Sequence, residues 1–165
     1  MIAALDADYR DTGATVGCVL FREWTDPQPT DELVHSVAGV AAYESGEFYK
    51  RELPVLLAAL GRVDVPLDTL VIDGHVWLDR SDRPGLGVHL HRALDERIPV
   101  VGVAKNAFGE SAPAHRVLRG ESLRPLYVTA VGLPIEVAAE KVRTMAGEHR
   151  IPTLLKRADA LSRSR

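Results

Sequence analysis

The chain has 165 residues, of which 46% are hydrophobic and 26% charged, and its formal net charge is −3 at pH 7. This length suits one domain with a single core. The composition is close to that of average globular proteins, which excludes fibrous and disordered classes. The small negative charge excludes the general attraction to nucleic acid that strongly basic domains show, so any such contact has to use local charge.

Two further features narrow the class of protein. Asp6 comes before any apolar signal segment could form, and no later run is long and uncharged enough to span a bilayer, so we expect a cytoplasmic protein without membrane contact. Cys18 is the only cysteine, which excludes an internal disulfide and a zinc site built from several thiolates.

The first third of the chain predicts extended structure. Apolar residues dominate residues 2–6, 14–22 and 33–41, and turn-forming residues separate these runs at 11–13 and 26–29. Short connections of this kind join neighbouring strands, so the simplest arrangement is a three-stranded antiparallel meander.

The middle of the chain changes to helical periodicity. Residues 46–63 place their apolar side chains on one helical face, and residues 69–73 form a short buried strand. Residues 85–97 predict a second helix and residues 100–104 a second buried strand. Because a strand, a helix and a strand in this order form a βαβ unit, the two strands should be parallel.

The last part of the chain predicts a strand at residues 126–130, a helix opened by proline at 134–146 and a final helix at 153–164. A meander followed by a βαβ unit and then helices predicts an α/β fold of the ribonuclease H-like type, with a mixed central sheet flanked by helices. No internal repeat or linker divides the chain, so we expect one domain over residues 1–165.

Acidic residues follow two of the buried apolar runs. Asp73, with Gly74 and His75 after it, ends the strand at 69–73, and Asp6 closes the short run at 2–5. The carboxyl ends of strands are where an α/β sheet normally presents its chemistry, so we expect the two carboxylates to lie together. Two strand-end acids suggest a metal site.

Glu52 and Asp159 each lie in a predicted helix beside its apolar face. Each of them alone is more typical of a solvated surface acid. If both converge with Asp6 and Asp73, pairs about 4 Å apart repel by roughly 4 kcal/mol at an effective dielectric constant of 20, and bound cations would relieve this repulsion. Oxygen ligands without cysteine or a spaced histidine pair favour Mg²⁺ or Mn²⁺ over zinc.

Two residues near the same strand ends have open interpretations. Lys105 follows the strand at 100–104 and is either an ordinary terminal lysine or a group that neutralises a phosphate oxygen or positions water. His75 is more typical of a hydrogen-bonded loop residue than of a ligand. Basic residues near the C-terminus are placed to touch phosphates, although a solvated helix face is the default interpretation.

In their order and spacing, these motifs resemble one known family. The chain is similar to the endonuclease V nucleases, which cut nucleic acid near inosine, and the similarity covers nearly its whole length. The matching segments are Asp6-Ala7-Asp8-Tyr9, Tyr43 with Gly46, Arg51-Glu52, Asp73-Gly74-His75, Gly102-Val103-Ala104-Lys105, Pro125-Leu126-Tyr127-Val128 and Arg157-Ala158-Asp159.

The resemblance implies a ribonuclease H-like nuclease that depends on Mg²⁺ or Mn²⁺. Water would attack a phosphodiester one nucleotide to the 3′ side of inosine and leave 3′-hydroxyl and 5′-phosphate ends. Lys105 would assist catalysis. The acids that would hold the metal are Asp6, Glu52, Asp73 and Asp159.

The resemblance also implies how the substrate binds. Tyr43 would be the wedge that enters the gap left by the extruded base, and extrusion is easiest at a mismatched or single-stranded base. Backbone near Gly46 and Gly74 would line the base pocket, with His75 beside it, because glycine allows the backbone to approach a ligand closely. The expected partner is inosine-containing DNA or RNA, bound by a monomer.

Two other functions remain open. The first follows from positions at which the chain departs from the family. Tyr43-Glu44-Ser45-Gly46 stands where the family usually has Tyr-Ile-Pro-Gly, and Asp79 replaces a second family histidine. One alternative is therefore a nuclease-like domain with altered specificity that binds nucleic acid or a protein. The other is a Mg²⁺-dependent phosphatase of the haloacid-dehalogenase type, which Asp6-Ala7-Asp8 resembles and Tyr9-Arg10 does not fit.

Overall fold

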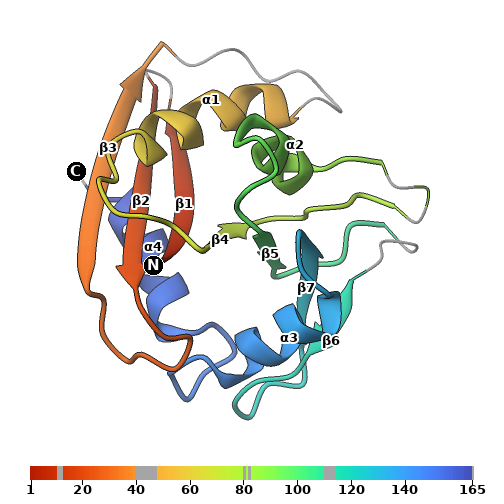
Figure 1. Cartoon of the computed structure of the whole chain (residues 1–165). Helices are drawn as coiled ribbons and strands as arrows, with labels where there is room; N and C mark the ends of the chain where they lie inside the picture. Colours follow the sequence, from red (N-terminus) through yellow and green to blue (C-terminus); the bar gives the residue numbers. More distant parts are fainter. Residues whose placement is uncertain (11–12, 40–47, 80, 82, 110–113, 165) are drawn as a thin grey trace.

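The structure is a computed structural model and describes residues 1–10, 13–39, 48–79, 81, 83–109 and 114–164. Within these residues, seven strands form one sheet in the order β3-β2-β1-β4-β5-β7-β6 (Figure 1). The strands are β1 (Ile2–Arg10), β2 (Gly13–Phe21), β3 (Asp31–Ala38), β4 (Thr69–Asp73), β5 (Val100–Ala104), β6 (His115–Val117) and β7 (Leu126–Val131).

The antiparallel meander predicted for the first three strands is confirmed. β1 pairs with β2 from Ile2 opposite Phe21 to Arg10 opposite Gly13, and β2 pairs with β3 in the same antiparallel manner. β1 is longer than predicted, because β2 offers it a partner along its whole length. The prediction that Asp6 closes the first strand is therefore wrong, and this acid lies in the middle of β1.

The central strands β1, β4 and β5 are parallel, which confirms the predicted βαβ unit. Leu5 of β1 lies opposite Ile72 of β4, so the next residues along the two strands, Asp6 and Asp73, are neighbours. β7 pairs antiparallel with β5. β6 is not predicted from the sequence, since its three residues are too few to show an alternating pattern.

Helices cover both faces of the sheet. α1 (Phe48–Leu60) and α2 (Leu86–Ala93) pack on one face, and α3 (Ile135–Thr144) and α4 (Thr153–Ser162) pack on the other (Figure 1). Each helix lies inside its predicted range and is shorter at one or both ends, because the apolar pattern continues into the adjoining turns. Among the described residues, every helix is too short or too polar to cross a membrane.

The alternation of side chains along the strands selects the face on which the predicted site residues lie. Ala4, Val71 and Val103 belong to the core that α3 and α4 cover. Side chains two residues apart on a strand share a face. The residues two positions later, which therefore point to the same face, are Asp6, Asp73 and Lys105.

Candidate active site

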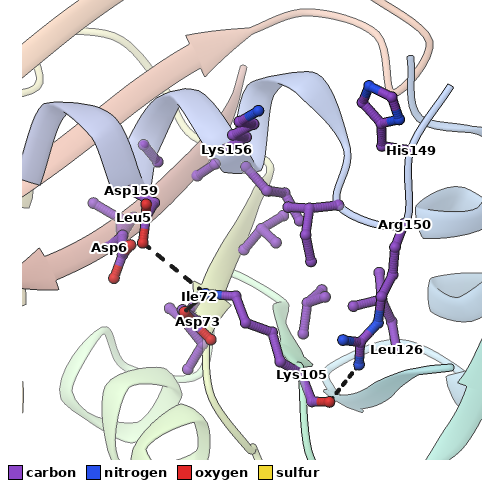
Figure 2. Close-up of a pocket in the computed structure, with 16 residues that line it drawn as sticks. Leu5, Asp6, Ile72, Asp73, Lys105, Leu126, His149, Arg150, Lys156 and Asp159 are labelled. Atoms are coloured by element: carbon purple, nitrogen blue, oxygen red, sulfur yellow. Dashed lines mark hydrogen bonds and ion pairs between the residues drawn. The ribbon is translucent and has the colours of Figure 1, made fainter. Parts of the chain in front are cut away.

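Three carboxylates and one lysine meet where β1, β4 and α4 come together (Figure 2). The Lys105 ammonium donates a hydrogen bond to Asp73 Oδ2 at 3.1 Å and lies 4.0 Å from Asp159 Oδ1. Asp6 is the third acid, and its pKa responds to both Asp73 and Asp159. Residues that the sequence predicted from four separate segments thus lie in one cluster.

A glycine in β2 allows α4 to come this close to the sheet. Gly17 lies opposite Asp6 in the β1–β2 ladder. A Cβ atom at Gly17 would lie 2.7 Å from Ser162 N and would collide with Ala158 O. The helix backbone therefore packs directly on the strand and carries Asp159 to Asp6. Gly17 is missed by the sequence prediction, although a glycine inside an apolar strand signals close backbone approach.

Glu52 approaches the same acids from α1. Its side chain is buried, at 8% exposure, so the alternative of a solvated surface acid does not hold. Burial, followed by the charges of Asp6 and Asp73, raises the pKa of Glu52 to about 8, against an opposing effect of Arg51. The Arg51 guanidinium itself lies over the Tyr9 ring, 4.4 Å from its centroid. Glu52 is thus a buried acid within the electrostatic reach of the cluster.

The cluster holds more negative charge than its lysine neutralises. Burial, followed by the charges of Asp73 and Asp159, raises the pKa of Asp6 to about 6. Burial alone would lower the pKa of Lys105, but the neighbouring carboxylates raise it above its ordinary value. The raised pKa of Lys105, which runs against the effect of burial, reflects the excess of negative charge, and a further cation would relieve this excess.

The donor set suits a hard divalent cation. The clustered acids offer carboxylate oxygens, the ligands that Mg²⁺ and Mn²⁺ prefer. Within the described residues, no three acidic or histidine side chains already surround one metal position. Two of the acids have partners of their own, since Asp73 accepts from Lys105 at 3.1 Å and Asp159 accepts from Arg163 at 2.7 Å. The residues fit the ion in chemistry, and each of these two carboxylates keeps a second oxygen outside these hydrogen bonds.

The loop after β4 carries the predicted substrate-binding residues Gly74 and His75. Gly74 has φ of 144°, a conformation that favours glycine. His75 Nε2 lies 3.1 Å from Asn106 O, and its Nδ1 is buried without a hydrogen-bond partner in the described part of the chain. Burial is the main cause of the lowered pKa of His75. A neutral imidazole with one unused nitrogen therefore stands next to the acids.

Two other predicted substrate-binding residues, Tyr43 and Gly46, lie outside the described residues. An exposed aromatic ring that the sequence prediction missed, that of Phe108, lies beside His75. Phe108 is 41% exposed, and its ring centroid lies 5.9 Å from that of His75. The guanidinium of Arg83 lies 5.7 Å from the Phe108 centroid. The His75 side of the site thus carries an exposed aromatic group next to a cation.

A cavity of about 360 Å³ opens on the α4 side of the acids (Figure 2). The acids and Lys105 form one end of it, and its walls are mainly apolar, with Val71, Val103 and Leu126 from the sheet and Ile151 and Leu155 from α4 and the segment before it. Basic side chains stand at its edge: His149, Arg150 and Lys156.

Two arginines that the sequence prediction missed stabilise the chain segments next to this cavity. Arg150 Nη2 donates to Pro125 O at 2.7 Å and to the carbonyl oxygen of Lys105. Arg119 is only 6% exposed. Arg119 donates to the backbone carbonyl groups of Arg143, Met145, Gly147, His149 and Arg150. These bonds tie the α3–α4 connection to the end of β5, and no local pattern distinguishes such arginines from surface ones.

Known proteins resemble this chain in sequence and in fold. Residues 1–128 match the family model described as Endonuclease V. The Endonuclease V of Nocardia farcinica is 29% identical over 184 aligned residues, which cover 99% of this chain and 80% of the relative. The crystal structure of the Endonuclease V from Streptomyces avermitilis superposes with a TM-score of 0.78 at 25% identity, over 98% of this chain and 79% of that one.

A third similar structure contains nucleic acid. It is the Ciona intestinalis Endonuclease V in complex with a 24mer DNA containing an inosine followed by a ribo-adenosine, with a TM-score of 0.78, 20% identity and coverage of 98% of this chain and 83% of that one. These similarities confirm the ribonuclease H-like fold, and the antiparallel meander speaks against the phosphatase alternative. Since the family model matches well over half of the residues, the chain belongs to the endonuclease V family of nucleases.

Proposed function

We propose that the chain is an endonuclease dependent on Mg²⁺ or Mn²⁺ that hydrolyses a phosphodiester on the 3′ side of inosine, or of another deaminated base, in DNA or RNA. The observation that carries this proposal is the convergence of Asp6, Asp73, Asp159 and Lys105, with Glu52 buried beside them. The raised pKa values of Asp6 and Glu52 show that their charged forms cost stability here, which favours a functional role over a purely structural one.

The acids and Lys105 would have different roles at the scissile phosphate. When bound, the metal would lower the pKa of the attacking water and neutralise charge on the phosphate. Asp6, Asp73 and Asp159 would hold it, with Glu52 behind them. The Lys105 ammonium, which now donates to Asp73, would donate to a phosphate oxygen once the substrate enters. All of these groups come from one chain, which supports a monomer as the active unit.

The loop after β4 supports the recognition of a base. Gly74 lets the backbone approach a ligand, and the unused Nδ1 of His75 is placed to accept or donate one hydrogen bond, according to its tautomer. Tyr43 and Gly46 are proposed to complete this pocket, with Tyr43 as the wedge. The inosine-containing DNA bound by the Ciona relative supports nucleic acid as the partner.

A cleavage assay tests the proposal. Labelled DNA and RNA strands that carry inosine or adenine at one position are incubated with the parent protein in Mg²⁺, in Mn²⁺ and in EDTA. We expect scission beside inosine only, with 3′-hydroxyl and 5′-phosphate ends, and none in EDTA. Lys105→Ala should lose scission. Lys141→Ala in α3 should keep it, because the Lys141 ammonium lies over the Trp24 ring and away from the acids.

Two outcomes contradict the proposal in different ways. Equal scission of the adenine and inosine strands would remove the base specificity and leave a general nuclease. Binding to inosine strands without scission in either metal would identify the altered, non-cutting homologue.

A further inference from the structure

We infer that the cavity between α4 and the sheet binds the base of the nucleotide on the 3′ side of the scissile phosphate, the one that keeps the 5′-phosphate after the cut. This inference rests on the proposed function and extends it, because it assigns a second base site to the same strand. The cavity shares one end with the acids and Lys105, where the phosphate would lie.

The loop that carries His75 and the cavity flank the acid cluster from different faces of the sheet. The loop after Asp73 leads through His75 to Val76, which is buried in the core under α1 and α2. The cavity lies on the opposite face, with Val71, Val103 and Leu155 in its walls. A strand that places its inosine at His75 and its phosphate at Lys105 therefore continues toward the cavity.

The size and walls of the cavity suit a nucleobase. Its volume of about 360 Å³ falls in the range of about 300 to 1,000 Å³ that is typical of small-ligand pockets. The sheet and α4 supply aliphatic side chains on both sides, so the faces of a base would be buried against Val103 on one side and Leu155 on the other. None of these side chains carries a hydrogen-bonding group, so we expect the site to accept any base.

The edge of the cavity supplies charge for the next phosphate. Lys156 is exposed there and forms no ion pair with the residues that the structure describes. The neighbouring Arg157 differs, because its guanidinium is engaged with both carboxylate oxygens of Glu32 at 2.7 Å. His149 and Arg150 also line the cavity, and the Arg150 guanidinium is engaged with the carbonyl oxygen of Lys105 (Figure 2). A free cation beyond an apolar pocket matches the alternation of base and phosphate along a strand.

A two-way comparison of protein and strand variants tests the inference. Leu155→Trp fills the cavity from a partly exposed position, and an abasic site at the second nucleotide 3′ to inosine removes the base that would occupy it. Each change alone should raise KM for scission about tenfold with little effect on kcat. Both together should raise KM no further than either one, because both remove the same contact.

Controls separate this contact from general damage. An abasic site two nucleotides to the 5′ side of inosine should leave the sensitivity to Leu155→Trp unchanged. Leu133→Trp enlarges a partly buried side chain of the same apolar cluster away from the cavity and should not change KM. Thermal melting checks the fold of each variant, and Ile151→Phe replaces Leu155→Trp if the latter does not fold.

The outcomes distinguish this inference from the proposed function. If the parent cuts inosine strands and the two changes add independently, or neither changes KM, the second base site is overturned and the proposed function stands. If the parent cuts no inosine strand, the proposed function fails and the second base site fails with it.

Discussion

Gly17 of β2 lies against the Ala158 carbonyl group of α4, with no room for a side chain between them. This contact sets the distance between the helix that carries Asp159 and the strand that carries Asp6. Gly17→Ala should push α4 outward by up to about 1 Å and separate the two acids. We expect scission to fall about 100-fold, as is typical of a misplacement of about 1 Å in an active site.

Gly61→Ala is the matched control for Gly17→Ala. A Cβ atom at Gly61 would lie 3.5 Å from Leu57 O, which is an ordinary contact. Kinetics of scission and urea unfolding should be measured for both variants. Equal scission by Gly17→Ala and the parent would show that α4 does not need this close approach to place Asp159.

Asp73→Asn should abolish scission while the fold persists. The amide keeps the shape of the carboxyl group, but it is a poorer ligand for a divalent cation and removes one charge from a crowded cluster. The metal-free variant should be at least as stable as the parent, and its binding to inosine strands should be retained because repulsion of the phosphate is relieved. Anisotropy of a labelled strand and gel analysis of scission check both parts, and scission at the parent's rate would refute the role of Asp73.

The metal-free protein should lose stability as pH rises from about 5 to about 8. The folded state raises the pKa of Asp6 from 3.8 to about 6 and that of Glu52 from 4.5 to about 8. Below the ordinary pKa values, Asp6 and Glu52 are protonated in both the folded and the unfolded state, so the two states bind the same number of protons there. Between the ordinary and raised values the folded state binds more protons, so the free energy of unfolding falls with pH, and above about 8 the loss is complete.

Thermal melts in EDTA from pH 5 to pH 8.5 measure this effect. The two shifts span about four pKa units between pH 5 and pH 8.5. With about 1.4 kcal/mol per pKa unit and about 2 to 4 °C per kcal/mol, we expect the melting temperature to fall by roughly 10 to 20 °C across this range. Glu52→Gln should flatten the profile, and millimolar Mn²⁺ should raise the melting temperature most at the alkaline end. A melting temperature that increases over this range in EDTA would contradict the raised pKa values.

Arg119→Lys should destabilise the protein despite keeping the charge. The guanidinium donates to five backbone carbonyl groups between Arg143 and Arg150, and an ammonium group cannot span them. Leaving buried carbonyl groups unsatisfied should lower the free energy of unfolding by about 3 kcal/mol. Arg116→Lys on the exposed side of β6 is the control, and urea unfolding compares the two. A loss below about 1 kcal/mol for Arg119→Lys would show that the connection between α3 and α4 holds by other contacts.

Tyr43→Ala should weaken strand binding without unfolding the protein. Loss of base stacking predicts a weakening of about 1 to 3 kcal/mol, or about five- to 150-fold. Titration with inosine and adenine strands measures it, with Tyr127→Ala in β7 as a comparison whose effect should appear in stability. Unchanged affinity for the inosine strand would remove Tyr43 from the role of wedge.

The elements that the sequence predicted well are those whose evidence is local. β4 and β5 are short apolar runs bounded by turns, and both occur at the predicted residues. The meander that precedes them has the predicted antiparallel arrangement, although the ends of its strands differ from the prediction. The position of Asp73 at the end of β4 and of Lys105 after β5 follows from the same local pattern. These features depend on alternation and turn chemistry over a few residues, so a single sequence carries them.

The distances within the site were decided by the tertiary structure. Asp6 and Asp159 are far apart in the sequence, and they meet because Gly17 admits the backbone of α4. The burial of Glu52, the bond between Lys105 and Asp73 and the cavity beneath α4 likewise depend on how separate elements pack. Periodicity specifies the face to which a side chain points, whereas the separation of two side chains depends on the volume of everything packed between them. The sequence therefore determined which residues are candidates for the site, and packing alone determined how they meet.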